Sequence, residues 1–176
     1  FAIEDTMSKP QLQPAGNFPP ATLIRRLAAM FYDFLLCVAL LMVVTLAYQQ
    51  GFLRLIYGGE KLRQLADQGG LTGDPLLSSL LFISLFAFFA KFWTYSGQTL
   101  GMQVWGIRVQ NADGSRISLL QALLRFIISI GSWACLGLGF LWMLWDKNKR
   151  TWHDRYSESV VIQIPKAVRK TTQGRG

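Results

Sequence analysis

Ionisable side chains within long apolar stretches are the residues of this sequence best placed to do chemistry. Asp33 is the only carboxylate in 27–48, and Arg125 is the only charged residue in 117–145. Arg26 precedes Asp33 by seven positions, which on a helix is about 10 Å along the same face. An ionised carboxylate facing lipid costs about 2.5–3.5 kcal/mol, so Asp33 must face protein or water.

Two interpretations of Asp33 stay open on these residues alone. Asp33 is either a proton or cation site, or a structural partner of Arg26 or Arg125. An arginine cannot escape the cost of burial by losing its proton. Since Asp33 is the only carboxylate in the apolar stretches, elimination predicts a contact between Asp33 and Arg125.

A second ionisable group, Arg150, His153 and Asp154, follows the last apolar stretch. His153 beside Asp154 resembles an acid/base pair, but no serine or cysteine stands in a recognisable nucleophile motif, so we expect no enzymatic activity. A lone histidine cannot complete a metal site, and we expect neither a metal nor a cofactor. The basic tail lacks the interleaved aromatic residues that stack on bases, so we expect no nucleic-acid partner.

The composition is that of a membrane protein. Of the 176 residues, 51% are hydrophobic and 16% are charged, against roughly 25% charged in soluble domains. About 20 apolar residues suffice to span a bilayer core of about 30 Å. We therefore predict an all-α membrane protein in which three apolar blocks form three or four transmembrane or re-entrant helices.

The first two blocks each predict one membrane helix. The first runs from the N-cap Thr22 to about residue 48, and the second runs from the N-cap Asp74, with Pro75 at its first position, to about residue 95. Serine, threonine and aspartate are favoured N-caps, and proline is favoured at the first helical position. The first block is expected to be an uncleaved anchor.

The third block, 118–145, has 28 residues, or about 42 Å of helix, which is too long for one upright span. It either forms a single tilted helix or bends near 129–135, and the charge distribution favours the bend. Small residues recur at i, i+4 and i+8, a pattern that lets membrane helices pack closely. They are Gly131, Cys135 and Gly139.

Basic residues flank the predicted membrane region at both ends. Arg25 and Arg26 open the first helix, and the chain from Asp146 onward has eight bases and three acids, so the positive-inside rule places both termini in the cytoplasm. An even number of crossings follows. Two segments, 105–109 and 159–164, alternate like strands and are expected to pair on the cytoplasmic side.

These boundaries divide the chain into three parts. A polar leader covers 1–21, in which 1–6 precede Met7 and are expected to be a non-native remnant. The membrane domain covers 22–164. The basic tail, 165–176, is expected to rest on anionic lipid, where each base contributes about 1 kcal/mol.

The segments 25–33, 97–109, 121–125 and 150–155, taken together and in this order, resemble the RDD family of small bacterial membrane proteins. Arg26, Asp33 and Asp154 match the arginine and two aspartates that give the family its name. Trp152 stands where many members have leucine, and 157–160 replaces a common Ala-Gly-Thr stretch. The segments are Arg-Arg-Leu-Ala-Ala-Met-Phe-Tyr-Asp (25–33), Gly-Gln-Thr-Leu-Gly-Met-Gln-Val-Trp-Gly-Ile-Arg-Val (97–109), Gln-Ala-Leu-Leu-Arg (121–125) and Arg-Thr-Trp-His-Asp-Arg (150–155).

The resemblance implies a multi-pass protein of the bacterial inner membrane. Some family members are associated with exchange of sodium or related cations for protons, which implies an oligomer with Asp33 as the intramembrane site and Arg26 and Arg125 in its charge network. The alternative is an accessory or scaffolding subunit of a larger envelope transport complex. The short chain and the lack of an internal repeat speak against transport by a single copy.

Overall fold

The computed structural model describes residues 10–70, 73–135 and 137–168. The expected remnant, 1–6, and the end of the basic tail, 169–176, lie outside the described residues. The chain divides into two compact units. Unit 1 holds the chain up to Asp33 and from Phe89 onward, and unit 2 holds Phe34–Phe88.

Within the described residues, two helices are long and apolar enough to cross a membrane, Leu23–Tyr57 and Pro75–Tyr95. The first joins α1 (Leu23–Leu46), a π-helical turn η1 (Ala47–Leu53) and α2 (Arg54–Tyr57). In each helix only 11% of the most apolar window is buried, so most of this apolar surface faces away from the protein, as lipid contact requires. The chain is an all-α membrane protein with a small sheet.

The first helix runs beyond the expected end near residue 48 and ends at Tyr57. No proline interrupts 48–57, and the helix ends at Gly58, whose φ of 77° leaves the helical region. A short helix, α3 (Gly59–Asp67), follows it in unit 2.

The start of α4 (Pro75–Tyr95) confirms the predicted N-cap. Asp74 Oδ1 accepts hydrogen bonds from the backbone N–H groups of Leu76 (2.9 Å) and Leu77 (3.4 Å). Asp74 Oδ2 also accepts a hydrogen bond of 2.6 Å from the hydroxyl of Tyr48. Within unit 2, the Tyr48 side chain also belongs to a small buried core with Leu53 and Leu62.

The third apolar block bends, as predicted. Helix α6 (Leu119–Ala134) has 16 residues, about 24 Å, which is short of the roughly 30 Å bilayer core. Gly137 then turns the chain with a φ of 78°, and its N–H donates to the carbonyl of Ser132 at 2.8 Å. Two short helices follow, α7 (Leu138–Leu141) and the 3₁₀ turn η2 (Trp142–Leu144). The alternative of a single tilted span is wrong.

The expected small-residue packing stripe does not form, because α6 ends before its last two members. Cys135 is exposed, and a Cβ on Gly131 would meet nothing within 4 Å. Gly139 does allow a close approach, since a Cβ there would lie 2.4 Å from Ser132 Oγ and 3.0 Å from Trp152. The close contact of Gly139 with Ser132 and Trp152 therefore packs the two sides of the bend against each other and against α8 (Trp152–Tyr156).

Strands β1 (Ile107–Asn111) and β2 (Ser159–Gln163) form a two-stranded antiparallel sheet, with Val109 opposite Val161. The predicted strand pairing is confirmed. Trp105, however, ends a helix, α5 (Leu100–Trp105), instead of beginning the strand. Gly106, in the left-handed region at φ 64°, makes the turn between α5 and β1.

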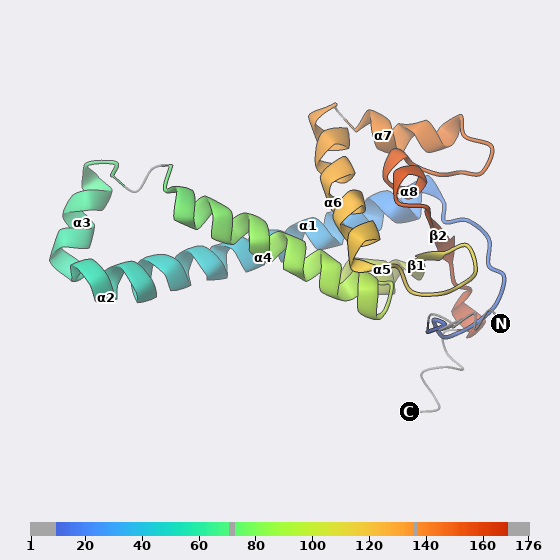
Figure 1. The fold of residues 1–176 in the computed structure, drawn as a ribbon, viewed down its shortest axis with the longest axis horizontal. Coiled ribbons are helices and arrows are strands. Elements are labelled where there is room, and N and C mark those ends of the chain that lie inside the picture. The colour runs from blue at the N-terminus through green and yellow to red at the C-terminus, as the bar shows by residue number, and fades with distance from the viewer. Residues whose placement is uncertain (1–9, 71–72, 136, 169–176) are drawn as a thin grey trace, which may run out of the picture. The chain divides into compact units, whose positions relative to one another are not determined.

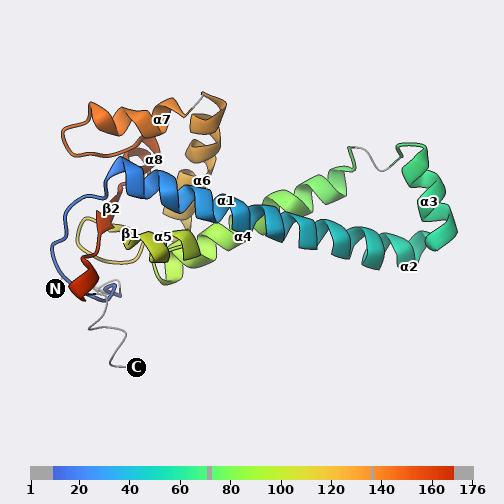
Figure 2. The ribbon, with the colours of Figure 1, turned by 180° about the vertical axis from the view of Figure 1, so that it is seen from behind.

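The leader lies against this sheet. Pro20 pairs with Ile162 in β2, and Gln11 pairs with Ser115 just after β1. In Figure 1 and Figure 2 the blue leader and the red β2 lie side by side. A third element, α8 (Trp152–Tyr156), directly precedes β2. The leader and the last strand therefore belong to one folded unit.

Candidate functional site

Asp154 lies at the centre of a buried group of charges in unit 1. Thr151 is the N-cap of α8, and its hydroxyl accepts a hydrogen bond from the N–H of Asp154. The Asp154 carboxylate accepts the N–H of Thr151 in return, at 3.3 Å. This capping box is encoded locally by the Thr-x-x-Asp spacing, and it leaves the carboxylate oriented by its own helix.

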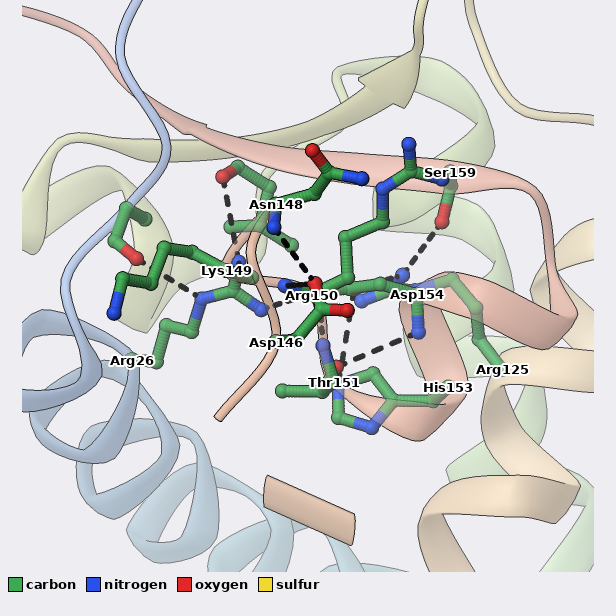
Figure 3. Close-up of polar contacts among 12 residues, drawn as sticks. Arg26, Arg125, Asp146, Asn148, Lys149, Arg150, Thr151, His153, Asp154 and Ser159 are labelled. Carbon is green, nitrogen blue, oxygen red and sulfur yellow. Dashed lines mark hydrogen bonds and ion pairs between the residues drawn. The ribbon is translucent and has the colours of Figure 1, made fainter. Parts of the chain in front are cut away.

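Two arginines from distant parts of the chain bind the two oxygens of that carboxylate (Figure 3). Arg26, in the first turn of α1, donates through Nη1 to Oδ2. Arg125, in α6, donates through Nη1 to Oδ1 at 2.6 Å. We call Arg26, Arg125 and Asp154 the arginine–aspartate cluster.

The remaining donors of Arg26 bind backbone carbonyls. Its Nε donates to Ala21 at 3.3 Å, and its Nη2 donates to Lys149 at 3.3 Å and to Val161 at 3.5 Å. These three carbonyls belong to the leader, to the loop before α8 and to β2. A single guanidinium group thus joins α1 to three other segments.

Arg125 has both polar and aromatic partners. Its Nη1 also donates to Ser159 Oγ at 2.6 Å, and its guanidinium carbon lies 5.3 Å from the centre of the Trp93 ring. A cation over an aromatic ring is stabilised by about 0.5–2 kcal/mol. Arg125 therefore connects α6 to α4 and β2 as well as to α8.

The cluster carries an excess of positive charge away from water. Arg26, Arg125 and Asp154 are 6%, 2% and 0% exposed. Burial alone would raise the pKa of Asp154, but the two guanidinium charges outweigh it and hold that pKa well below its usual range. For the neighbouring His153, burial is the largest cause that lowers the pKa, to about 3, so this imidazole is neutral near pH 7.

Asp33 belongs to a different set of contacts. The Thr99 hydroxyl donates to Asp33 Oδ2, and the Gly101 N–H donates to Oδ1 at 2.9 Å. Thr99 is the N-cap of α5, so the carboxylate binds the positive end of that helix. Arg25 binds the other end, donating to the Trp105 carbonyl at 2.8 Å. Helix α5 is therefore attached to α1 at both of its ends.

The contact between α1 and α5 is very close. A Cβ added to Gly101 would lie 2.3 Å from the Ala29 carbonyl oxygen and 2.9 Å from the Asp33 carboxylate carbon. Only glycine allows the two helices to approach in this way. The observed hydrogen bonds and this packing give Asp33 a structural place in the fold.

The predicted contact between Asp33 and Arg125 is wrong. Elimination considered only carboxylates inside the apolar blocks, whereas Asp154 folds back from the polar segment and binds both Arg26 and Arg125. The residues missed by sequence reasoning are those that orient the carboxylates, Thr151 and Thr99. The Thr-x-x-Asp capping pattern at 151–154 was the signal that could have found the first of them.

The other two predicted residues, His153 and Arg150, lie near the cluster but form none of the ion pairs between arginine and Asp154. His153 Nε2 is 3.9 Å from Asp154 Oδ1. Arg150 donates its backbone N–H to Asp146 Oδ2 at 2.9 Å, which closes the loop before α8. Within the described residues, no group of three or more histidine, cysteine or acidic side chains is placed to hold a metal ion.

Comparison with known proteins identifies a family for most of the chain. The model of the RDD family matches residues 20–158, which include Arg26, Asp33 and Asp154. No curated protein and no solved structure gives a significant match. Because the family match covers most of the chain, the chain belongs to the RDD family.

Proposed function

We propose that this protein is a non-enzymatic accessory or scaffolding subunit of a larger bacterial envelope transport complex. The observation that carries the proposal is the contact between Asp33 and α5. Both carboxylate oxygens accept hydrogen bonds from α5, and the space between Ala29 and Gly101 is too small for a methyl group. A cation bound there would compete with these donors for the carboxylate oxygens.

Two further features support a subunit role. Only 11% of the most apolar window of each candidate span is buried within the chain, which leaves apolar surface for lipid and for neighbouring helices. The arginine–aspartate cluster ties the leader, α6, α8 and β2 together, so unit 1 offers a rigid surface to a neighbouring subunit.

Proton-coupled transport of a monovalent cation by an oligomer is the second candidate. One observation favours it: Asp33 is 6% exposed and, within the described part of the chain, forms no ion pair with a basic group. A buried carboxylate without a counter-charge is a common feature of proton and cation sites in membranes.

A flux measurement separates these candidates. The purified chain is reconstituted in vesicles, and proton movement driven by a sodium gradient is followed from pH 6 to 9. The scaffolding proposal predicts no flux with the wild-type chain. Flux that disappears in Asp33→Asn and persists in Asp67→Asn, an exposed control in α3, would establish transport and overturn the proposal.

The composition of the native assembly gives an independent test. A subunit of a larger complex, solubilised mildly from its own membranes, should migrate together with different chains in a fixed ratio. A stable assembly of this chain alone would count against the accessory role and favour an oligomeric transporter.

We further propose that the protein is a multi-pass protein of the bacterial inner membrane with both termini in the cytoplasm. In support, Ala21 N–H donates to the Val161 carbonyl at 2.9 Å, so the leader and β2 lie on one side. Single cysteines at Gln68 and Lys166, introduced after replacing Cys37 and Cys135 by alanine, test this topology. Only the cysteine at residue 68 should react with an impermeant reagent outside.

A further inference from the structure

An open pocket of about 700 Å³ lies in unit 1, between the leader, the sheet and the loop before α8. Basic side chains dominate its charged lining, and Asp113 is the acidic residue among them. The basic lining residues are Arg26, Arg108, Lys147, Lys149 and Arg150.

Buried positive charge next to this pocket exceeds buried negative charge. Arg26 and Arg108 line it and are 6% and 1% exposed, and Arg125, 2% exposed, shares the carboxylate of Asp154 with Arg26. Arg26 and Arg125 thus share a single carboxylate, and Arg108 donates only to uncharged groups among the described residues. Charges taken out of water need counter-charges nearby, so the pocket is a favourable place for an anion.

Arg108 has a hydrogen-bonding group that the described residues leave unmet. Its Nε and Nη2 donate to Gln110 Oε1 at 3.0 and 2.7 Å, and Nη2 also donates to the Pro14 carbonyl at 3.0 Å. Its Nη1 is buried and has no partner among the described residues. Leaving a buried donor unmet is destabilising, and an anion in the pocket, directly or through a water molecule, would satisfy this one.

The acidic groups near the pocket are already engaged by their own loops. Asp113 Oδ1 accepts from the N–H and the hydroxyl of Ser115, at 2.9 and 2.6 Å. Asp146 Oδ2 accepts from the N–H groups of Asn148 and Arg150 (Figure 3). The second set of bonds holds the loop that carries three of the five bases, so the basic lining is positioned by the fold.

The pocket lies beside the start of a helix that is long and apolar enough to cross a membrane. Pro20 and Arg26, which flank the first residue of α1, both line it, and the end of a membrane-spanning helix lies at headgroup depth. We propose that this pocket binds the phosphate group of an anionic ligand, supplied by a phospholipid headgroup or by a soluble phosphate ester. This site is independent of whether the protein is a scaffold or a transporter.

The test uses the full chain in nanodiscs of phosphatidylcholine. In one arm phosphatidic acid is added to the bilayer, and in the other glycerol 3-phosphate is added to the solution. The pocket variant is Lys147→Glu with Lys149→Glu, and the matched control is Arg155→Glu with Arg63→Glu, two bases that do not line the pocket. All four side chains are exposed, and the two variants change the net charge equally, so the unliganded unfolding temperatures serve as the folding check.

We expect a phosphate-bearing ligand to raise the thermal unfolding temperature of the wild-type chain and of the control. In the pocket variant the dissociation constant should rise about tenfold or more, since two bases that attract the phosphate group become two acids that repel it. Stabilisation by phosphatidic acid alone identifies a lipid headgroup, and stabilisation by glycerol 3-phosphate identifies a soluble ester. No stabilisation by either ligand, or equal weakening in both variants, would overturn the proposal.

Discussion

Arg26 and Asp154 are 128 positions apart in the sequence and form a buried ion pair that joins the first turn of α1 to α8. Two of the three residues expected from the resemblance to match the arginine and aspartates of the family name thus meet in one contact. The third, Asp33, binds the N-terminus of α5 instead. These three residues therefore lie at two separate points at which distant segments are attached to α1.

The three members of the arginine–aspartate cluster should differ in how strongly their loss destabilises the protein. Asp154→Asn leaves two buried guanidinium groups without a carboxylate, and we expect it to cost about 3–5 kcal/mol. Arg125→Met leaves Arg26 and Asp154 as a neutral ion pair, so it should lower the free energy of unfolding clearly less than Asp154→Asn does. Thermal unfolding in one detergent gives the order. An Arg125 variant less stable than the Asp154 variant would contradict this charge balance.

Gly101→Ala should destabilise the attachment of α5 to α1. The added Cβ would lie 2.3 Å from the backbone oxygen of Ala29, and overpacking of this kind costs about 1–3 kcal/mol. The unfolding temperature should fall, and Gly51→Ala, whose Cβ would meet nothing within 4 Å, is the control. Equal unfolding temperatures for the Gly101 variant and the wild type would mean that the two helices do not approach so closely.

The two glycines around the bend in the third block should respond in opposite ways to alanine. Gly139→Ala places a Cβ 2.4 Å from Ser132 Oγ and should cost about 1–3 kcal/mol. Gly131→Ala lies in α6 with open space around it and should stabilise the helix by about 0.5–1 kcal/mol. Unfolding temperatures measure both changes. Stabilisation by both substitutions would indicate one straight helix through the bend.

Mild acid should destabilise the protein through His153. Its pKa is lowered, first by burial, to about 3 in the folded chain, against about 6.5 when unfolded. Between these values only the unfolded chain binds the proton, so stability should fall with falling pH by up to about 1.4 kcal/mol per pH unit. The lowered pKa of Asp154 adds a loss in the same direction only at more acidic pH, below about 4.

The comparison of wild type with His153→Gln isolates this effect. Unfolding temperatures measured from pH 6 to pH 4.5 should fall for the wild type and stay nearly level for the variant. Parallel curves for the two proteins would assign the acid sensitivity to another group.

Several elements of the fold were predictable because helix caps and strand alternation depend only on residues close together in the sequence. Asp74 followed by Pro75 marked the start of α4, and the alternation in 159–164 marked β2. Helix α5 was missed because its polar surroundings and the alternation in 105–109 suggested a strand. Its end signals were nevertheless present, Thr99 as N-cap and Gly106 after the last turn.

The candidate site was harder to predict because its contacts are long-range. Burial of Arg125 correctly required a carboxylate, but the nearest carboxylate in the apolar blocks was Asp33, and a one-dimensional pattern does not show that Asp154 folds back. The role of Asp33 depends on Gly101, 68 positions away. Apolar periodicity gives no information about such a pairing.

Asp154, and not Asp33, is the counter-charge of Arg125. Two double-mutant cycles on unfolding temperature, with Arg125→Met combined with Asp154→Asn and with Asp33→Asn, test it most directly. We predict strong coupling in the Asp154 cycle and additive effects, within about 0.5 kcal/mol, in the Asp33 cycle. Strong coupling of Arg125 to Asp33, with additive effects for Asp154, would contradict the account.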